Sequence, residues 1–231
     1  MKALGILSGG AAQGLVASLA PAFRAETGLE ITGEYGAVGG MADRLRNGGK
    51  ADIIILTAAL VAKLAEEGLV DRASVADVGV VETALAVRSG DPKVSVETAE
   101  DLRNVLVAAD AIFAPDTKIS TAGIHVANVL RQLGIADAVA GRLKIYPNGA
   151  TAMRELAASR ASRPIGCTQS TEIIATEGVE LSGPLPRGCE LATTYTAAVT
   201  AGAENAAAAQ ALIGILTSAD ARESRRRAGF L

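Results

Sequence analysis

The residue of this chain best suited to proton transfer is His125, its only histidine. An unperturbed imidazole titrates near pH 6.5, so it can accept and release a proton close to neutrality. The surrounding pattern predicts a helix over residues 121–133, with His125 about one turn inside it. A lone histidine is more often structural or exposed, and a perturbed Asp, Glu, Lys or Tyr could serve instead. His125 is therefore our catalytic candidate if the protein is an enzyme that moves a proton.

A second group of candidates follows the ends of predicted strands, where helices begin. The unpaired N–H groups of a helix N-terminus favour an anion, and a nearby hydroxyl or amide adds a further hydrogen bond. Turn geometry or N-capping alone would also explain these residues. The candidate ligand-binding residues are Ser8, Gly9, Gly10, Gly39, Gly40, Thr57, Ser120, Thr121, Asn148, Gln169 and Ser170.

Other chemistry is poorly represented in the sequence. Lys118 and Arg154 could each supply a charge-assisted hydrogen bond to a carboxylate, although most such side chains are solvated. Acidic, histidine and cysteine residues do not show metal-ligand spacing, and neither a Walker loop nor a nucleophile elbow occurs. Cys167 and Cys189 lack CxxC spacing and are expected to be small buried hydrophobes. We therefore expect no metal and no cofactor.

The elements that position these residues form two series of strand, turn and helix. Short apolar runs predict strands, repeats at helical spacing predict helices, and Gly28, Gly68 and Gly134 mark helix ends. Three such units in a row argue for a parallel sheet. The first series has strands at 2–7, 29–35 and 52–56 and helices at 11–23, 41–47 and 58–67.

The second series repeats this order after a longer segment at 79–88. Thr98 and Asp101 resemble a capping box at the start of its first helix, with Asp in place of the preferred Glu. A turn-rich passage at 183–188 separates this series from the end of the chain. Strands are predicted at 111–114, 143–146, 164–168 and 191–200, and helices at 98–106, 121–133, 149–158, 171–175, 204–216 and 219–227.

Composition and charge narrow the classes of partner. The 231 residues carry a net charge of -3 and only 3% aromatic residues, so neither nucleic acid nor an acidic membrane surface is favoured as a partner. No apolar run is long enough to insert into a membrane, and no secretory signal is visible. We therefore expect a cytoplasmic protein, or a periplasmic one if a leader was removed. The oligomeric state stays open.

Five spaced motifs resemble the type II periplasmic binding proteins, and in particular the molybdate-binding component of ABC transporters. The resemblance extends over nearly the whole chain. The motifs are the Ser-Gly-Gly-Ala-Ala run at 8–12, Glu-Thr-Gly at 26–28, Tyr-Gly-Ala-Val-Gly-Gly at 35–40, Ala-Asp-Ile-Ile-Ile at 51–55 and Thr-Ala-Gly-Ile-His at 121–125.

This resemblance implies an α/β, two-lobed fold of the type II periplasmic-binding-protein class, with a ligand cleft between the lobes. It also implies that the chain crosses between lobes twice, near 80–85 and 189–196, and that the crossings act as a hinge. The expected lobes are residues 1–80 together with 192–231, and residues 81–191.

Departures from the molybdate-binding pattern bear on the ligand. By alignment, Ala11 stands where those proteins have a serine, the second turn offers Ala37 and Val38 in place of hydroxyls, and Gln169 stands where they have a tyrosine. Backbone donors survive these changes, whereas side-chain hydroxyls do not. We therefore expect a small anion, and a di- or tricarboxylate rather than molybdate.

The Ser-Gly-Gly opening and the Thr-Ala-Gly-Ile-His turn also resemble aconitate isomerase-type proteins of the same fold. That resemblance implies a cytoplasmic isomerase as the alternative function, catalysing a 1,3-proton shift on an unsaturated polycarboxylate. Such a reaction needs a base beside an acidic carbon and donors on the carboxylates that gather charge. A ligand-responsive regulatory protein is a third reading. An ABC permease is an expected partner only if the protein is exported.

Overall fold

The computed structural model describes residues 3–231, which form two compact units. Unit 1 contains the chain up to Val81 and again from Thr193 to Leu231, and unit 2 contains Glu82–Ala192. The chain therefore passes from one unit to the other twice, at 81/82 and at 192/193. Lys2, which we expected in the first strand, lies outside the described residues.

Unit 1 is built on three parallel strands followed by one antiparallel strand. Its strands stand in the order β2-β1-β3-β9; β1 pairs in parallel with β2 and β3, and β9 is antiparallel to β3. The elements are β1 (Ala3–Gly9), α1 (Gln13–Thr27), β2 (Glu30–Gly36), α2 (Val38–Arg46), β3 (Ile53–Thr57), α3 (Ala58–Glu66), β9 (Ala192–Val199), α9 (Ala206–Thr217) and α10 (Arg222–Arg227), with 3-10 turns at Gly10–Ala12 and Arg72–Ser74.

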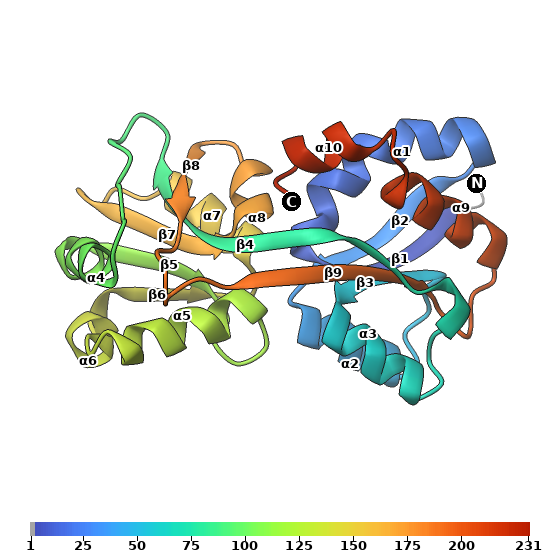
Figure 1. The fold of residues 1–231 in the computed structure, drawn as a ribbon, viewed down its shortest axis with the longest axis horizontal. Coiled ribbons are helices and arrows are strands. Elements are labelled where there is room, and N and C mark those ends of the chain that lie inside the picture. Colours follow the sequence, from blue (N-terminus) through green and yellow to red (C-terminus); the bar gives the residue numbers. More distant parts are fainter. Residues whose placement is uncertain (1–2) are drawn as a thin grey trace. The chain divides into compact units, whose positions relative to one another are not determined.

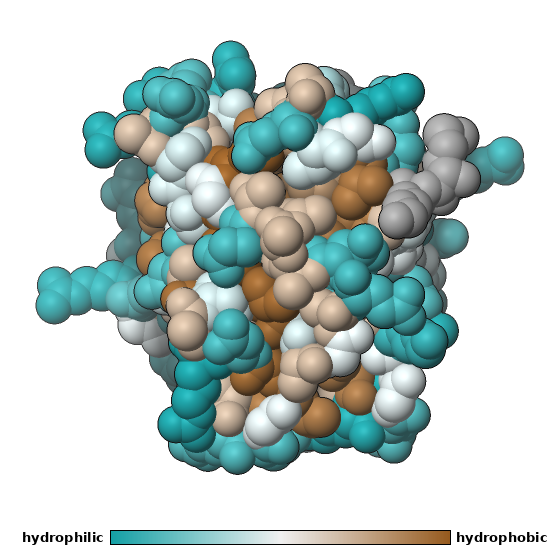
Figure 2. Space-filling model, turned by 90° about the vertical axis from the view of Figure 1, so that its right-hand side faces the viewer, coloured by the Kyte–Doolittle hydropathy of each residue, from teal (hydrophilic) through white to brown (hydrophobic). Residues whose placement is uncertain are grey.

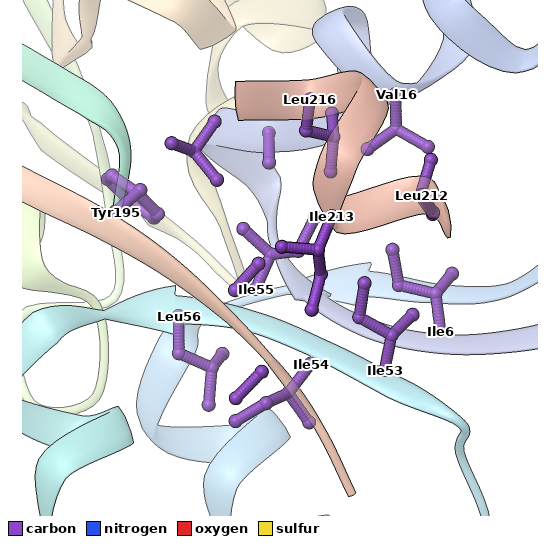
Figure 3. Close-up of a cluster of buried hydrophobic side chains, with 14 of the residues drawn as sticks. Ile6, Val16, Ile53, Ile54, Ile55, Leu56, Tyr195, Leu212, Ile213 and Leu216 are labelled. Atoms are coloured by element: carbon purple, nitrogen blue, oxygen red, sulfur yellow. The ribbon is translucent and has the colours of Figure 1, made fainter. Parts of the chain in front are cut away.

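The core of unit 1 surrounds β3. Because helices cover both faces of the sheet, an all-apolar strand is buried on both sides. Figure 3 shows Ile54 and Leu56 pointing to one face, while Ile53 and Ile55 point toward the side of Ile213 on α9. These side chains are fully buried, which stabilises the fold by about 1.5–3 kcal/mol for each large apolar side chain.

The helices of unit 1 are divided between the two faces of its sheet. Helix α1 packs against α9 and α10, and α2 packs against α3 on the other side (Figure 1). On the face drawn in Figure 2, apolar residues form only an interrupted strip between hydrophilic ones. The large apolar residues of the unit 1 core, such as Phe23 and Ile54, are buried.

Unit 2 repeats the plan of unit 1. Its strands stand in the order β6-β5-β7-β4; β5 is parallel to β6 and β7, β4 is antiparallel to β7, and β8 pairs with β4. The strand β4 (Ala76–Arg88) begins in unit 1. The other elements are α4 (Ala99–Ala108), β5 (Ala111–Pro115), α5 (Thr121–Gln132), α6 (Ala136–Val139), a 3-10 turn (Ala140–Arg142), β6 (Leu143–Tyr146), α7 (Gly149–Ala157), β7 (Pro164–Gln169), α8 (Ser170–Ile174) and β8 (Val179–Pro184).

The two faces of the unit 2 sheet carry separate cores. Ile165 and Cys167 of β7 pack with α4, α5 and α6. The alternate residue Gly166 faces α7, because a Cβ added there would lie 2.6 Å from the Cε of Met153. We call the first side the α5 face and the second the α7 face.

Most predicted elements are confirmed, including the parallel pairing of the first three strands. Gly28 ends α1 with φ of 71°, and Thr98 and Asp101 form the capping box of α4. Several boundaries were wrong. Helix α1 begins at Gln13 after a 3-10 turn, α10 begins at Arg222 rather than at 219, and α2 begins at Val38, so Gly39 and Gly40 lie inside its first turn. The strand β8 was missed.

Candidate functional site

The carboxyl ends of β1, β2 and β3 meet at one edge of unit 1, which we call edge 1. Gly9 is opposite Gly36, and Ser8 is opposite Ile55, so the three strands end at the same level. The residues that follow are Gly10, Ala37–Gly40 and Thr57–Ala58. This edge is where a parallel sheet presents the N-termini of its helices.

Within edge 1, Ser8 turns its side chain inward. It is fully buried, and its hydroxyl donates to the carbonyl of Gly9 at 2.9 Å. Gly9 is closely packed, because a Cβ there would lie 2.7 Å from Val38 and 2.9 Å from the ring of Tyr195. Of the first turn, Gly10 is therefore the half-exposed residue that can offer its backbone to a ligand.

The N-termini of α2 and α3 complete edge 1. Neither N-cap residue makes a side-chain capping bond within residues 3–231, although Thr57 at the N-cap of α3 has a hydroxyl. Gly39 and Gly40 are half-exposed, whereas Ala37 and Val38 are buried. Backbone N–H groups at these helix starts can therefore receive an anion.

Two tyrosines stand at edge 1 that sequence reasoning did not select. Tyr195 of β9 pairs with Thr57 and packs edge-on against Phe230, with ring centroids 6.4 Å apart. Burial raises the pKa of Tyr35 to about 12, so its hydroxyl keeps its proton at neutral pH. The position of Tyr195 depends on the antiparallel pairing of β9 with β3, which is a long-range contact without a local sequence signal.

Edge 2 is the corresponding edge of unit 2, where β5, β6 and β7 end. It contains Ser120–Thr121, Asn148–Gly149 and Gln169–Ser170. The parallel register, with Pro115 opposite Tyr146 and Phe113 opposite Gly166, brings these three turns to one edge. The sequence candidates of the second series are therefore neighbours in the fold.

The start of α5 resembles the helix starts of edge 1. Asp116 accepts hydrogen bonds from the N–H groups of Lys118 at 2.7 Å and Ile119 at 3.1 Å, which fixes the loop before the helix. Ser120 is the N-cap, yet within the described chain its hydroxyl makes no capping bond. The first N–H groups of α5 and the Ser120 hydroxyl are thus available for a ligand.

The start of α7 is already occupied by protein groups. The side-chain oxygen of Asn148 accepts from the N–H of Thr151 at 2.8 Å, so this candidate acts as a helix cap. The carboxylate of Glu172 accepts from the N–H groups of Gly149 and Ala150 and from the Thr168 hydroxyl at 2.6 Å. An external anion would have to displace Glu172 from α7.

Glu172 is a buried carboxyl group that sequence reasoning missed. Burial raises its pKa, while the hydrogen bonds from Thr168 and from the backbone of Ala150, Gln169 and Gly149 act in the opposite direction. Gly149 is required here, because a Cβ would lie 1.9 Å from Oε2 of Glu172. Its local pattern resembled an ordinary helix residue, since only packing against α7 buries it.

Gln169 and Ser170 join β7 to α8, and both are buried. Gln169 is only 2% exposed, and neither Nε2 nor Oε1 has a hydrogen-bond partner among residues 3–231. Thr83, its partner on β4, is 1% exposed, and its Oγ1 is equally unpartnered within that range. Edge 2 therefore holds buried polar atoms that pair with no group of the described residues.

His125 lies one turn inside α5, as expected, and its ring is oriented by the chain. Its Nε2 is 2.8 Å from the carbonyl oxygen of Cys189. A carbonyl only accepts, so Nε2 carries the hydrogen and Nδ1 is the nitrogen that can exchange a proton. Cys189 and Cys167 are buried, as predicted, and burial raises the pKa of Cys167 to about 12.

The two cationic candidates are exposed. Arg154 donates to the Thr151 hydroxyl at 3.0 Å, and Lys118 follows Asp116 in the loop before α5. In residues 3–231, no group of three or more His, Cys, Asp and Glu side chains could hold a metal ion. None of the helices in that range is long and apolar enough to cross a membrane.

Comparison with known proteins identifies related chains. The family model described as bacterial extracellular solute-binding protein matches residues 4–231. An aconitate isomerase from Pseudomonas sp. is 27% identical over 98% of this chain and 87% of its own length. These matches extend over nearly the whole chain.

Two solved structures share the fold. The periplasmic molybdate-binding protein of Azotobacter vinelandii aligns with a TM-score of 0.82 and 19% identity, covering 99% of this chain and 98% of that one. The sulfate-binding protein of Mycobacterium tuberculosis aligns with a TM-score of 0.78 and 19% identity, covering 100% of this chain and 86% of that one. The predicted α/β, two-lobed binding-protein fold is thereby confirmed.

Proposed function

Because the chain belongs to the bacterial extracellular solute-binding protein family, we propose that it binds a small anion, and a di- or tricarboxylate rather than molybdate. The helix starts of each edge, taken by itself, offer backbone donors for such a ligand. The solved relatives named for molybdate and sulfate support the choice of an anion. The aconitate isomerase relative supports a carboxylate.

The observation that carries the proposal is the set of helix starts at α2, α3 and α5. In the described chain, none of the three N-cap residues makes a side-chain capping bond, although Thr57 and Ser120 carry hydroxyls. Such N-termini carry partial positive charge and free N–H groups, which favour an anion by about 0.3–1 kcal/mol each at exposed sites. A hydroxyl that does not cap its own helix is free to bind a ligand.

The side chains of edge 1 support the carboxylate class. Ala37 and Val38 add no hydrogen bond to the backbone donors, and Gly39 and Gly40 leave space around them. A compact tetrahedral oxyanion benefits from many short hydroxyl contacts, whereas carboxylates on a carbon frame can reach separate helix starts. The larger ligand therefore suits this edge better.

A ligand panel tests the proposed class. Thermal unfolding would be followed with equal concentrations of molybdate, sulfate, phosphate, citrate and the two aconitate isomers. A ligand at 100 times its Kd stabilises the native state by about 2.7 kcal/mol, so binding appears as a higher Tm. We expect the tricarboxylates to raise the Tm more than molybdate; a larger effect of molybdate would reverse the ranking.

Replacing Gly10 tests the location. The variant Gly10→Val places a branched side chain on the half-exposed turn of edge 1 and should weaken citrate binding at least tenfold, or about 1.4 kcal/mol. Gly214→Val on α9 is the matched control, because a Cβ there would have no described atom within 4 Å apart from its chain neighbours and its own helix backbone. Equal affinity of a folded Gly10→Val protein would place the ligand elsewhere.

The second candidate function is a 1,3-proton shift on an unsaturated tricarboxylate, favoured by the relative named aconitate isomerase. His125 would take a proton from one carbon through Nδ1 and return it two carbons away. Donors at the helix starts would stabilise the carboxylate that gathers the charge. The bond from Nε2 to the Cys189 carbonyl would hold the ring during both transfers.

Proton exchange with solvent tests the isomerase. Wild type and His125→Gln would be incubated with each aconitate isomer in deuterated water and followed by NMR. We expect the wild type to interconvert the isomers and the variant to be at least 100-fold slower. A variant that keeps the wild-type rate would exclude His125 as the proton carrier. A wild type that does not interconvert the isomers would exclude the aconitate isomerase function, and anion binding would be the remaining proposal.

Location separates the two functions. A binding protein that delivers its ligand to an ABC permease works outside the cytoplasmic membrane, whereas an isomerase can work in the cytoplasm. The cytoplasmic location stays a prediction. Cell fractionation with an immunoblot measures it directly.

A further inference from the structure

The feature that goes beyond anion binding is the buried amide of Gln169. An amide presents two donors on Nε2 and an acceptor at Oε1. Within the described chain neither atom has a hydrogen-bond partner, although the residue is only 2% exposed. Leaving such groups unpaired costs about 1–3 kcal/mol each, so an unpaired buried amide calls for a reason.

The surroundings of Gln169 place it on the α5 face of the sheet. Ile165 and Cys167 lie on that face, and Gln169 continues their alternation along β7. Its partner Thr83 bonds through its backbone to Leu185 and Leu191, away from β7. The two residues thus form a non-hydrogen-bonded pair, in which the side chains of opposite residues lie close together.

The backbone of Gln169 is held in place. Its N–H donates to the carboxylate of Glu172, which also binds the start of α7. The unpartnered amide therefore stands on a fixed backbone at the end of β7, on the face where α5 begins. A preorganised group of this kind can discriminate between ligands.

We propose that Gln169 is a specificity-determining residue that selects ligands carrying a hydroxyl or an acid proton beside their negative charge. This inference rests on the proposed anion binding. In either orientation of the amide, Oε1 remains an unpaired acceptor that only a donor can satisfy. A fully deprotonated oxyanion can use only the Nε2 donors and leaves Oε1 unpaired, whereas a hydroxyl can pair with both ends. The ligand class is therefore a hydroxylated di- or tricarboxylate.

Two pairs of anions isolate this effect. Citrate and tricarballylate share a carbon frame and three carboxylates, and only citrate has the central hydroxyl. Hydrogen phosphate and sulfate are both tetrahedral dianions, and only hydrogen phosphate has an O–H. We expect calorimetry to show citrate binding about 10- to 100-fold more tightly than tricarballylate, and hydrogen phosphate more tightly than sulfate.

The variant Gln169→Met keeps the length of the side chain and removes both polar groups. We expect the ratio of citrate to tricarballylate affinity to fall toward one, through weaker citrate binding. Gln169→Leu is the second variant if the methionine protein does not fold. Gln132→Met is the matched control, because that amide already donates to the carbonyl of Gly188 at 2.9 Å, and its ratio should stay at the wild-type value.

The outcomes separate this inference from the function on which it rests. Equal binding of citrate and tricarballylate by the wild type would overturn the role of Gln169 and leave anion binding intact. A preference for citrate over tricarballylate that survives in a folded Gln169→Met or Gln169→Leu protein would also overturn the role of Gln169 and leave anion binding intact. Failure of all four anions to bind would remove the proposed function and this inference together.

Discussion

Edges 1 and 2 are built on the same order of strands. In unit 1, β1 lies between β2 and β3, and in unit 2, β5 lies between β6 and β7; an antiparallel strand follows β3 and β7. The side chains at the two edges differ, because edge 1 presents Gly10, Gly39 and Gly40 while edge 2 presents Ser120, Asn148 and Gln169. The shared plan places helix starts at both edges, and the polar side chains among these residues stand at edge 2.

The largest difference between the edges should appear at their glycines. A Cβ at Gly149 would lie 1.9 Å from Glu172 and 2.2 Å from Thr168, whereas a Cβ at Gly40 would have no described atom within 4 Å apart from its chain neighbours and its own helix backbone. We expect Gly149→Ala to lower the free energy of unfolding by about 3 kcal/mol because the buried groups must move. Urea unfolding measures this loss.

Gly40→Ala is the comparison for that variant. It should leave the free energy of unfolding unchanged or raise it by about 0.5–1 kcal/mol, because alanine restricts the unfolded chain more than glycine does. Equal losses in both variants would show that the two edges are packed alike.

A second difference concerns the buried carboxyl groups of the two units. Burial alone would raise the pKa of Asp52 in unit 1, but hydrogen bonds from Gly5, Asn205 and Glu204 hold the pKa below its ordinary value. We expect Asp52→Asn to cost about 2 kcal/mol of unfolding free energy at pH 7. A lowered pKa stabilises the fold above the unfolded-state value and loses this effect as the pH falls through the folded-state value.

The cost of Asp52→Asn should therefore shrink as the pH falls below 3.8, the ordinary pKa of this group. Unfolding curves of both proteins between pH 3 and pH 7 would give the profile. If the loss of unfolding free energy in Asp52→Asn stays constant over this range, the charge of Asp52 does not contribute to stability.

Glu172 in unit 2 should show the opposite profile with a smaller effect. Its pKa is raised by burial, so its contribution to stability is present below 4.5, its ordinary pKa, and is lost as the pH rises through the folded-state value. Relative to Glu172→Gln, the wild type should lose unfolding free energy as the pH rises from 4 to 8. A difference that grows in favour of the wild type over this range would contradict the raised pKa.

The smallest expected effects compare two N-cap residues. Asn148 caps α7, so Asn148→Ala should cost about 1 kcal/mol of unfolding free energy. Thr57 makes no capping bond within the described chain, so Thr57→Ala should change stability by less than about 0.5 kcal/mol while weakening citrate binding. Paired unfolding and calorimetry measurements on both variants test this; a stability loss at Thr57 without a change in affinity would assign it to folding alone.

Local sequence patterns predicted the repeated elements because each strand and helix of the two series has its own periodicity. Strand β6 was predicted with its observed bounds, and β3 was recognised as a buried apolar run. Strand β8 was missed because it ends in Gly183 and Pro184, which read as a turn. Its pairing with β4, including a register shift near Leu85, depends on residues far away in the chain.

The candidate site, like the fold, was predictable only in part from the sequence. Helix starts such as Ser120 could be located because they follow apolar strands, and the structure brings the turns of each series to one edge. The direction of a side chain could not be read from the sequence, so the inward turn of Ser8 and the capping role of Asn148 appear only in the structure. Glu172 and Tyr195 were missed because packing against distant segments gives them their positions.

The double passage of the chain between the units has a consequence for synthesis. Unit 2 ends at Ala192, whereas unit 1 still lacks β9 and α9 at that point. During translation, the second unit therefore has all of its residues before the first one does. Until the last 39 residues, 193–231, emerge, Ile53 and Ile55 lack the cover of α9, and the far side of β3 lacks its strand partner. Strand β3 can therefore complete its native packing only after residues 193–231 have been made.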